Sequence, residues 1–155
     1  MTFTVYQLIP DDAPLLEAML TMFGEAFGEP HTYNDARPSR SYLIRLLAGD
    51  TFIAVAALDD ETVVGGLAAY VLPKFEQERS EIYVYDLAVA AGYRRRGIAT
   101  RMIRELQRIA ARRGVWVIFI QADRGDEPAI ALYSRLGRCE DVLHFDIPVV
   151  PDIDP

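Results

Sequence analysis

The sequence predicts an α/β (α+β) protein in which a central mixed, mostly antiparallel sheet is flanked by helices. Segments of strand period alternate with segments of helical period over the 155 residues. Two neighbouring apolar runs are separated only by the polar residues 59–61, which is typical of an antiparallel hairpin. A strand–helix–strand unit over residues 80–122 adds one parallel pair with a right-handed crossover.

Four elements are expected before the hairpin. Residues 4–9 alternate like an edge strand, and Pro10 and the acids after it begin a helix. Its apolar face ends at Gly24, a helix stop. Residues 28–38 contain two prolines and are expected to form an irregular loop, after which Ser39 caps a short helix that ends at Gly49. The face of the first helix contains Leu15, Leu16, Met19, Leu20 and Phe23.

The remaining elements follow from longer patterns. Strands are expected over 51–58, 62–72 and 80–89, and the very apolar run 115–122 indicates a buried strand. A strongly amphipathic helix ends at Gly114, and another runs from the acids before Pro128 to Gly137. Residues 139–147, with Cys139 buried, supply a final strand. The apolar face of the long helix contains Ile98, Met102, Leu106, Ile109 and Ala110, and its basic face Arg101, Arg104, Arg108 and Arg112.

Length and composition predict a single domain over residues 1–147 and a proline-rich tail over 148–155. No apolar run approaches the roughly 20 residues that span a bilayer, and the first residues lack a signal-peptide pattern, so a cytoplasmic protein is expected. The single cysteine excludes an intramolecular disulfide. His31 and His144 are too far apart in sequence for a metal-ligand motif, so no metal is expected.

Charge is unevenly distributed along the chain. The net charge is −7, yet arginines gather between Arg94 and Arg113. This division indicates one phosphate-like partner and one cationic partner, although an unevenly charged solvated surface would give the same pattern. Nucleic acid is not an expected partner, because the chain is acidic overall and carries no nucleic-acid-binding motif.

The loop between the strand 80–89 and the long helix carries the sharpest signal. Free N–H groups at a helix start, with the helix dipole behind them, attract an anion. Gly97 lets an oxyanion approach the backbone, Ala99 keeps the next turn small, and Thr100 adds a hydroxyl donor. The loop matches neither the dinucleotide fingerprint nor a Walker A loop. The sequence therefore predicts a pyrophosphate site, with an arginine-rich solvated helix start as the alternative.

The pattern Arg94-x-x-Gly97-x-Ala99 resembles the signature of the GCN5-related N-acetyltransferase (GNAT) superfamily. The resemblance implies the GNAT fold and a pyrophosphate of acetyl-CoA bound by Arg94, Arg95, Arg96, Gly97, Ile98, Ala99 and Thr100.

A second motif, Asp126-x-x-Ala129-x-x-x-Tyr133-x-x-x-Gly137, is similar to the superfamily's Asn-x-x-Ala-x-x-x-Tyr-x-x-x-Gly. It departs at two positions. Asp126 replaces the asparagine, and Arg138 replaces the aromatic residue that follows the final glycine of the superfamily motif. The resemblance implies that Tyr133 protonates the departing thiolate and that Ala129 lies beside the pantetheine arm. A phenol stays protonated at neutral pH and can serve as this acid. A core tyrosine with a satisfied hydroxyl is the alternative.

The strand before the loop is expected to hold both substrates. In relatives, backbone groups matching Leu87, Ala88 and Val89 bind the pantetheine where this strand splays from the strand 115–122. Because side chains alternate, Asp86 points to the face opposite Leu87, where it could hold an ammonium or remove its proton. Glu81 is the weaker candidate base, because alternation puts it opposite Asp86 unless a bulge intervenes. A surface aspartate without a role is the alternative for Asp86.

Further blocks, among them 23–28, 51–54, 68–76, 80–89, 121–126 and 144–147, are similar to the aminoglycoside 3-N-acetyltransferases of the gentamicin type. That resemblance implies an aminoglycoside acceptor, its 3-amino group and a role in antibiotic resistance. A polycation calls for carboxylates in its pocket. The alternatives are another small amine such as a polyamine or amino-sugar, a peptide N-terminus, or a non-catalytic acyl-CoA sensor. A homodimer is compatible with the sequence. The candidate substrate-binding acids are Asp86, Asp123, Asp126, Glu127 and Asp146.

Overall fold

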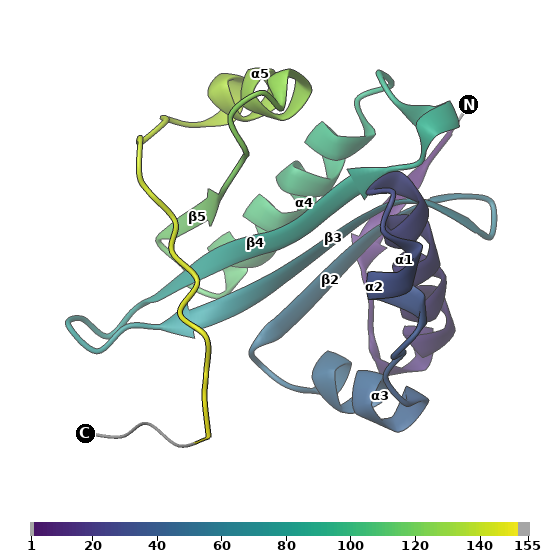
Figure 1. Ribbon diagram of the computed structural model, residues 1–155, viewed down its shortest axis with the longest axis horizontal. Helices are drawn as coiled ribbons and strands as arrows, with labels where there is room; N and C mark the ends of the chain where they lie inside the picture. Colours follow the sequence, from purple (N-terminus) through teal and green to yellow (C-terminus); the bar gives the residue numbers. More distant parts are fainter. Residues whose placement is uncertain (1, 152–155) are drawn as a thin grey trace. The chain divides into compact units, whose positions relative to one another are not determined.

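The computed structural model of the protein describes residues 2–151 (Figure 1). The chain divides into a first unit, residues 1–121, and a second unit, residues 122–155. The single domain expected over residues 1–147 stays a prediction. Within the described residues, no helix is both long and apolar enough to cross a membrane.

The first unit is built on one five-stranded sheet in the order β1-β2-β3-β4-β5 (Figure 1). Neighbouring strands from β1 to β4 are antiparallel, and β4 and β5 are parallel. The mixed, mostly antiparallel sheet flanked by helices is therefore confirmed. The strands are β1 (Thr4–Gln7), β2 (Phe52–Asp59), β3 (Thr62–Pro73), β4 (Ser80–Val89) and β5 (Val117–Ile120).

Helices cover both faces of this sheet (Figure 1). The helix α1 (Ala13–Ala26) packs on one face, where a Cβ on Gly66 would lie 2.4 Å from Met19 Cγ. The helix α4 (Ile98–Arg112) packs on the other, where a Cβ on Gly65 would lie 3.0 Å from Ile98 Cγ2. Because side chains alternate along a strand, these two glycines identify the face of each position of β3 from Gly65 to Pro73.

The predicted amphipathic character of α4 is confirmed. All five residues of the predicted apolar face are buried. The four arginines of the predicted basic face are exposed. This helix supplies the crossover between β4 and β5, and its first turn follows directly on the loop 90–97.

The segment after α1 differs from the expectation. Gly24 does not end the helix, which continues to Ala26. Its role is close packing, because a Cβ at Gly24 would lie 2.8 Å from Asn34 Nδ2. The expected loop 28–38 instead contains a short helix, α2 (Pro30–Asn34), which Pro30 begins.

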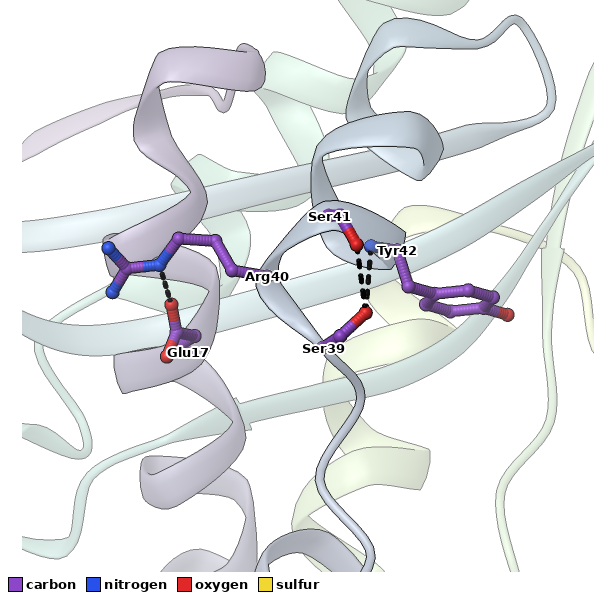
Figure 2. Close-up of polar contacts among 5 residues, drawn as sticks. All are labelled: Glu17, Ser39, Arg40, Ser41 and Tyr42. Carbon is purple, nitrogen blue, oxygen red and sulfur yellow. Dashed lines mark hydrogen bonds and ion pairs between the residues drawn. The ribbon is translucent and has the colours of Figure 1, made fainter.

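The predicted cap at Ser39 is confirmed. Figure 2 shows Ser39 Oγ accepting a hydrogen bond from the Tyr42 backbone N–H at 3.2 Å, at the start of α3 (Arg40–Ala48). Arg40 Nε also bonds Glu17 Oε1 at 2.6 Å and so ties α3 to α1 (Figure 2). Gly49 ends α3 as expected.

The strand expected over 115–122 is shorter and less buried than predicted. It is reduced to β5, residues 117–120, and all four residues are half-buried. The reason is its place at the edge of the sheet, where it pairs only with β4.

The second unit contains the helix α5 (Glu127–Leu136). Asp126 caps it by accepting a hydrogen bond from the Ala129 N–H at 3.3 Å, and Gly137 ends it, as predicted. The strand expected over 139–147 is wrong: residues 138–151 form neither helix nor strand, and Cys139 is exposed. Residues 122–151 include no strand with which this run could form a ladder. Residues 152–155 of the expected tail lie outside the described residues.

Candidate active site

The central feature of the site is a β-bulge in β4. Asp86 pairs with Ala68 and Val84 pairs with Ala69, so Tyr85 is an extra residue on the β4 side of the ladder. A bulge of this kind shifts the alternation of side chains by one position.

The bulge changes the position of Glu81. Glu81 lies opposite Leu72 and Asp86 lies opposite Ala68, and both β3 partners are an even number of residues from Gly66. Glu81 and Asp86 therefore point to the same face of the sheet, the one covered by α1. The expectation of opposite faces, which held only without a bulge, is overturned.

Asp86 is half-buried on this face, which is opposite the face of Leu87, as alternation predicted. Tyr33 Oη, from α2, donates a hydrogen bond to Asp86 Oδ1 at 3.0 Å. Burial raises the pKa of the Asp86 carboxyl, and the hydrogen bond from Tyr33 lowers it in part. The structure thus holds a carboxylate in a poorly solvated place with one neutral donor.

Tyrosine rings surround the carboxylate. The Tyr85 ring lies 6.1 Å from Tyr70, edge to face, and 5.4 Å from Tyr83. Tyr83 in turn stacks on Phe119 of β5 at 4.7 Å. Burial raises the pKa of Tyr70 and of Tyr83, and the charge of Asp86 adds to both shifts. Electron-rich ring faces beside a carboxylate form a surface suited to an ammonium group.

Glu81 lies at the far end of the same face. Its Oε2 is 3.9 Å from Lys74 Nζ, and Lys74 is also 3.9 Å from Glu76 Oε1. The lysine balances part of the charge of Glu81. Asp86 has no such partner among the described residues.

The second half of β4 leaves one edge open. β5 pairs only with residues Glu81–Val84 of β4, so residues 85–89 have a strand neighbour only on the β3 side. The Ala90 N–H donates to the Val64 carbonyl at 2.8 Å. Because bonding positions alternate in an antiparallel ladder, Ala88 faces β3 while the peptide groups of Leu87 and Val89 face the open edge.

The loop after β4 presents backbone donors. Arg95 and Gly97 both have positive φ, 63° and 78°, and Gly97 precedes α4 without a side-chain cap. The first N–H groups of α4 therefore have no partner in a helical turn or from a cap. A Cβ at Gly97 would meet nothing within 4 Å, so the space above it is open. Such a loop fits an anion.

The arginines frame this loop from the solvent side. Arg94 Nε donates to the Val89 carbonyl at 3.2 Å, and Arg96 lies over the ring of Tyr93 at 5.2 Å. Tyr93 Oη in turn donates to Asp59 Oδ2 at 2.9 Å. Ile98 is buried, while Ala99 and Thr100 are half-buried. The residues of the predicted pyrophosphate loop are therefore brought together.

The second unit holds the remaining candidates. Tyr133 is half-buried in α5, and burial, helped by the charge of Asp126, raises the pKa of its phenol. The carboxylate of Asp126 caps α5, and Asp146 bonds His144 at 2.9 Å. Ala129 is half-buried, and Asp123 and Glu127 are exposed.

Sequence reasoning did not identify the tyrosines around Asp86. Tyr83 lies three residues before Asp86 and shares its face only because of the bulge, which no residue pattern announces. Tyr33 comes from a segment expected to be an irregular loop. The described residues contain no group of three or more His, Cys, Asp or Glu side chains that could hold a metal ion.

The chain belongs to the acetyltransferase (GNAT) family, whose model matches residues 16–137. The fold and the open half of β4 agree with the GNAT fold expected from the resemblance.

Two solved structures are similar over almost the whole chain. An aminoglycoside acetyltransferase from an uncultured soil metagenomic sample is 59% identical, with a TM-score of 0.94, covering 97% of this chain and 100% of that one. A second such enzyme from an uncultured soil metagenomic sample, in complex with sisomicin, is 28% identical, with a TM-score of 0.88, covering 96% and 97%.

Streptothricin acetyltransferase of Streptomyces lavendulae is 26% identical over 129 residues, covering 83% of this chain. The chain spans only 59% of the length of that curated relative.

Proposed function

We propose that this chain transfers an acetyl group from acetyl-CoA to an amine of an aminoglycoside, the 3-amino group, and so confers antibiotic resistance. The observation that carries the proposal is the placement of a half-buried carboxylate among tyrosines on the half of β4 that leads directly into the anion-binding loop.

Acetyl-CoA fits the residues at and after the open edge. The exposed arginines and the uncapped N–H groups from Gly97 to Thr100 would hold its pyrophosphate. The peptide groups of Leu87 and Val89 would hold the pantetheine arm as a missing strand would, with Ala88 between them facing β3. When bound, the coenzyme supplies the acetyl group as a thioester. Side chains of this chain would hold the amine and transfer the protons.

Asp86 is the residue proposed to engage the amine. A substrate amine is mostly an ammonium at neutral pH and cannot attack a thioester until it loses a proton. Asp86 would hold that ammonium by charge while the rings of Tyr70, Tyr83 and Tyr85 line its approach. The proton leaves to Asp86 or to water. Glu81, on the same face, is the second candidate base.

Tyr133 is the proposed general acid. Its raised pKa keeps the phenol protonated over the physiological pH range, so the hydroxyl has a proton to give to a departing thiolate. Its place in the second motif, seven residues after Asp126, supports this role.

The aminoglycoside acceptor rests on two lines of support. Both similar solved structures reported above are aminoglycoside acetyltransferases, one of them at 59% identity. The whole chain also carries a net charge of −7 despite its basic loop, which favours a polycation. We further propose Asp123, Asp126, Glu127 and Asp146 as substrate-binding acids. The 3-amino position follows from the sequence blocks shared with enzymes of the gentamicin type.

A thiol-release assay tests the proposal. The protein is incubated with acetyl-CoA and one acceptor at a time. The acceptors are gentamicin, sisomicin, spermidine, an amino-sugar and a peptide amine. We expect turnover with the aminoglycosides, and two-dimensional NMR of the product should show acetylation at the 3-amino group. Turnover with spermidine alone would overturn the aminoglycoside acceptor, and acetylation at another amine would overturn the position.

A further inference from the structure

We propose that Tyr33 is a positioning residue that fixes the Asp86 carboxylate toward the amine and keeps it as an anion. The inference rests on the proposed role of Asp86. It assigns a task to α2, a segment with no part in the coenzyme motifs.

The geometry gives the carboxylate one fixed oxygen and one available oxygen. Tyr33 Oη donates to Asp86 Oδ1 at 3.0 Å, and this is the one hydrogen bond of the Asp86 side chain within the described residues. The bond restricts rotation of the carboxylate. Oδ2 remains available for an ammonium.

Tyr33 is itself held firmly by its neighbours. Its ring lies 6.0 Å from Phe23 and 5.7 Å from Phe27, both from the end of α1. Gly24 lets α2 sit close on α1, because a Cβ there would be 2.8 Å from Asn34 Nδ2 and 3.2 Å from Pro30 Cα. A hydroxyl on such a support keeps its position without help from the substrate.

Asn34 and Arg37 brace the same segment. Asn34 Nδ2 donates to the Pro30 carbonyl at 2.8 Å, across α2. Arg37 Nη2 donates both to Asn34 Oδ1 and to Thr21 Oγ1 of α1. The Glu29 N–H also donates to the Gly24 carbonyl of α1 at 2.9 Å, so the segment that carries Tyr33 is bonded to α1 on both sides of the tyrosine.

The groups around Asp86 explain why a donor is needed. Its neighbours are Tyr33 from α2, Tyr70 from β3, and Tyr83 and Tyr85 from β4, none of them a cation. The charge of Tyr42, in α3, contributes to the raised pKa of Tyr70. The charge of Glu29 contributes in the same way to the raised pKa of Tyr33. Glu81 lies on the same face of the sheet as Asp86, and Lys74 Nζ lies 3.9 Å from Glu81 Oε2. Burial raises the pKa of Asp86, and the Tyr33 hydroxyl opposes that rise.

Tyr33→Phe removes this hydroxyl and keeps the ring that packs on Phe23 and Phe27. The Asp86 carboxyl should then titrate at a pH higher by roughly one unit, the usual size of one hydrogen bond to a charged group. Carbon-13 NMR of labelled aspartate, assigned with Asp86→Asn, measures this without any substrate. Tyr6→Phe, which removes a hydroxyl from β1, is the matched control and should leave that titration unchanged.

Kinetics supply a second readout. In Tyr33→Phe, kcat/KM for an aminoglycoside at pH 6–7 should fall roughly tenfold, with the acid limb of its pH profile moved upward. KM for acetyl-CoA should stay the same. In an Asp86→Asn background, Tyr33→Phe should cause no further loss, whereas a merely structural tyrosine would cause the same loss in both backgrounds.

The outcomes separate the two proposals. An Asp86 carboxyl that titrates at the same pH with and without the Tyr33 hydroxyl overturns the inference. If the wild type acetylates no aminoglycoside, the proposed function fails, and the carboxyl titration still decides the role of Tyr33. Should Tyr33→Phe fail to fold, Gly24→Ala displaces α2 instead. An unchanged Asp86 titration in that variant, with α2 shown by NMR to have moved, would contradict the inference.

Discussion

The two halves of β4 have a similar sequence and very different surroundings. Residues Ser80–Val84 pair with β3 on one side and, from Glu81 on, with β5 on the other, and Ile82 and Val84 are buried. Residues Asp86–Val89 pair with β3 alone. The extra residue Tyr85 lies between the halves. One inserted residue and one missing neighbour leave the second half of the strand with a half-buried carboxylate on one face and peptide groups at an open edge.

The two halves of β4 also contribute differently to the protein. The first half holds the fold together through apolar side chains that face α4. The second half offers peptide groups at an open edge, a carboxylate on the opposite face, and a direct lead into the loop 90–97.

Deletion of Tyr85 should have the largest effect. Without the extra residue, one half of β4 must turn over, because side-chain direction has a period of two. Turning the first half would expose Ile82 and Val84, each at about 1.5–3 kcal/mol, and turning the second would direct Asp86 toward the α4 layer. We expect a loss of at least 3 kcal/mol in the free energy of unfolding, measured by urea denaturation.

Tyr85→Ala is the control for that deletion. It removes the exposed ring and keeps the extra residue, so the bulge and the free energy of unfolding should change little. A deletion variant as stable as Tyr85→Ala would mean that the bulge does not determine which side chains share a face.

Tyr133→Phe tests whether the chemistry needs a group outside β4. Loss of the hydroxyl should lower the single-turnover rate of acetyl transfer by roughly 10²-fold, the usual scale for a positioned acid. The Kd of acetyl-CoA, measured by calorimetry, should be unchanged. A wild-type rate would show that the thiolate leaves without this proton.

Gly97→Val tests the loop at the end of the open half. Valine at a φ of +78° is strained, and its side chain would fill the space over the loop that an oxyanion needs. The Kd of coenzyme A should rise by roughly tenfold or more. Gly114→Val imposes the same kind of strain, at a φ of +68°, beyond the other end of α4.

Gly114→Val should therefore lower the melting temperature much as Gly97→Val does, with no change in the Kd of coenzyme A. Equal losses of affinity in the two variants would assign the effect to strain in α4 rather than to the loop.

The smallest effect expected is on stability. Because the folded-state pKa of Asp86 is raised, the folded protein gains stability as the pH falls toward and through that pKa. Asp86→Asn carries no buried charge, so at pH 7 it should melt a few degrees higher than the wild type. The difference should shrink toward pH 4. Asp60→Asn, in an exposed turn that asparagine also tolerates, should show no such trend.

The sequence predicted the loop after β4 and the start of α4 well because their signals are local. These signals are Gly97, the arginines before it and the amphipathic period of α4. All of them fall within about 25 consecutive residues, and each lies where expected. The same holds for the Ser39 cap and for Asp126 at the start of α5. Caps and helical faces depend on neighbours three or four residues away.

The features that were missed depend on distant partners. The bulge at Tyr85 arises from the match between β3 and β4, so the position of Glu81 could be given only conditionally. Tyr33 and Asp86 are 53 residues apart in sequence. The expected strand over 139–147 rested on its apolar residues alone, and apolar residues do not by themselves provide the hydrogen-bonding partner that a strand requires. The single domain, the homodimer and the cytoplasmic location stay predictions.

The most direct test of the central claim compares Asp86→Asn with the wild type in acetylation of gentamicin. The account predicts that kcat/KM for gentamicin falls by roughly 10²-fold or more, because both the charge that holds the ammonium and a candidate proton acceptor are lost. The Kd of acetyl-CoA should be unchanged, since the coenzyme is proposed to bind through backbone groups at the open edge and through the loop and helix start after β4, not through the Asp86 side chain. A variant that acetylates gentamicin as fast as the wild type would contradict the account and leave Asp86 a carboxylate without a role.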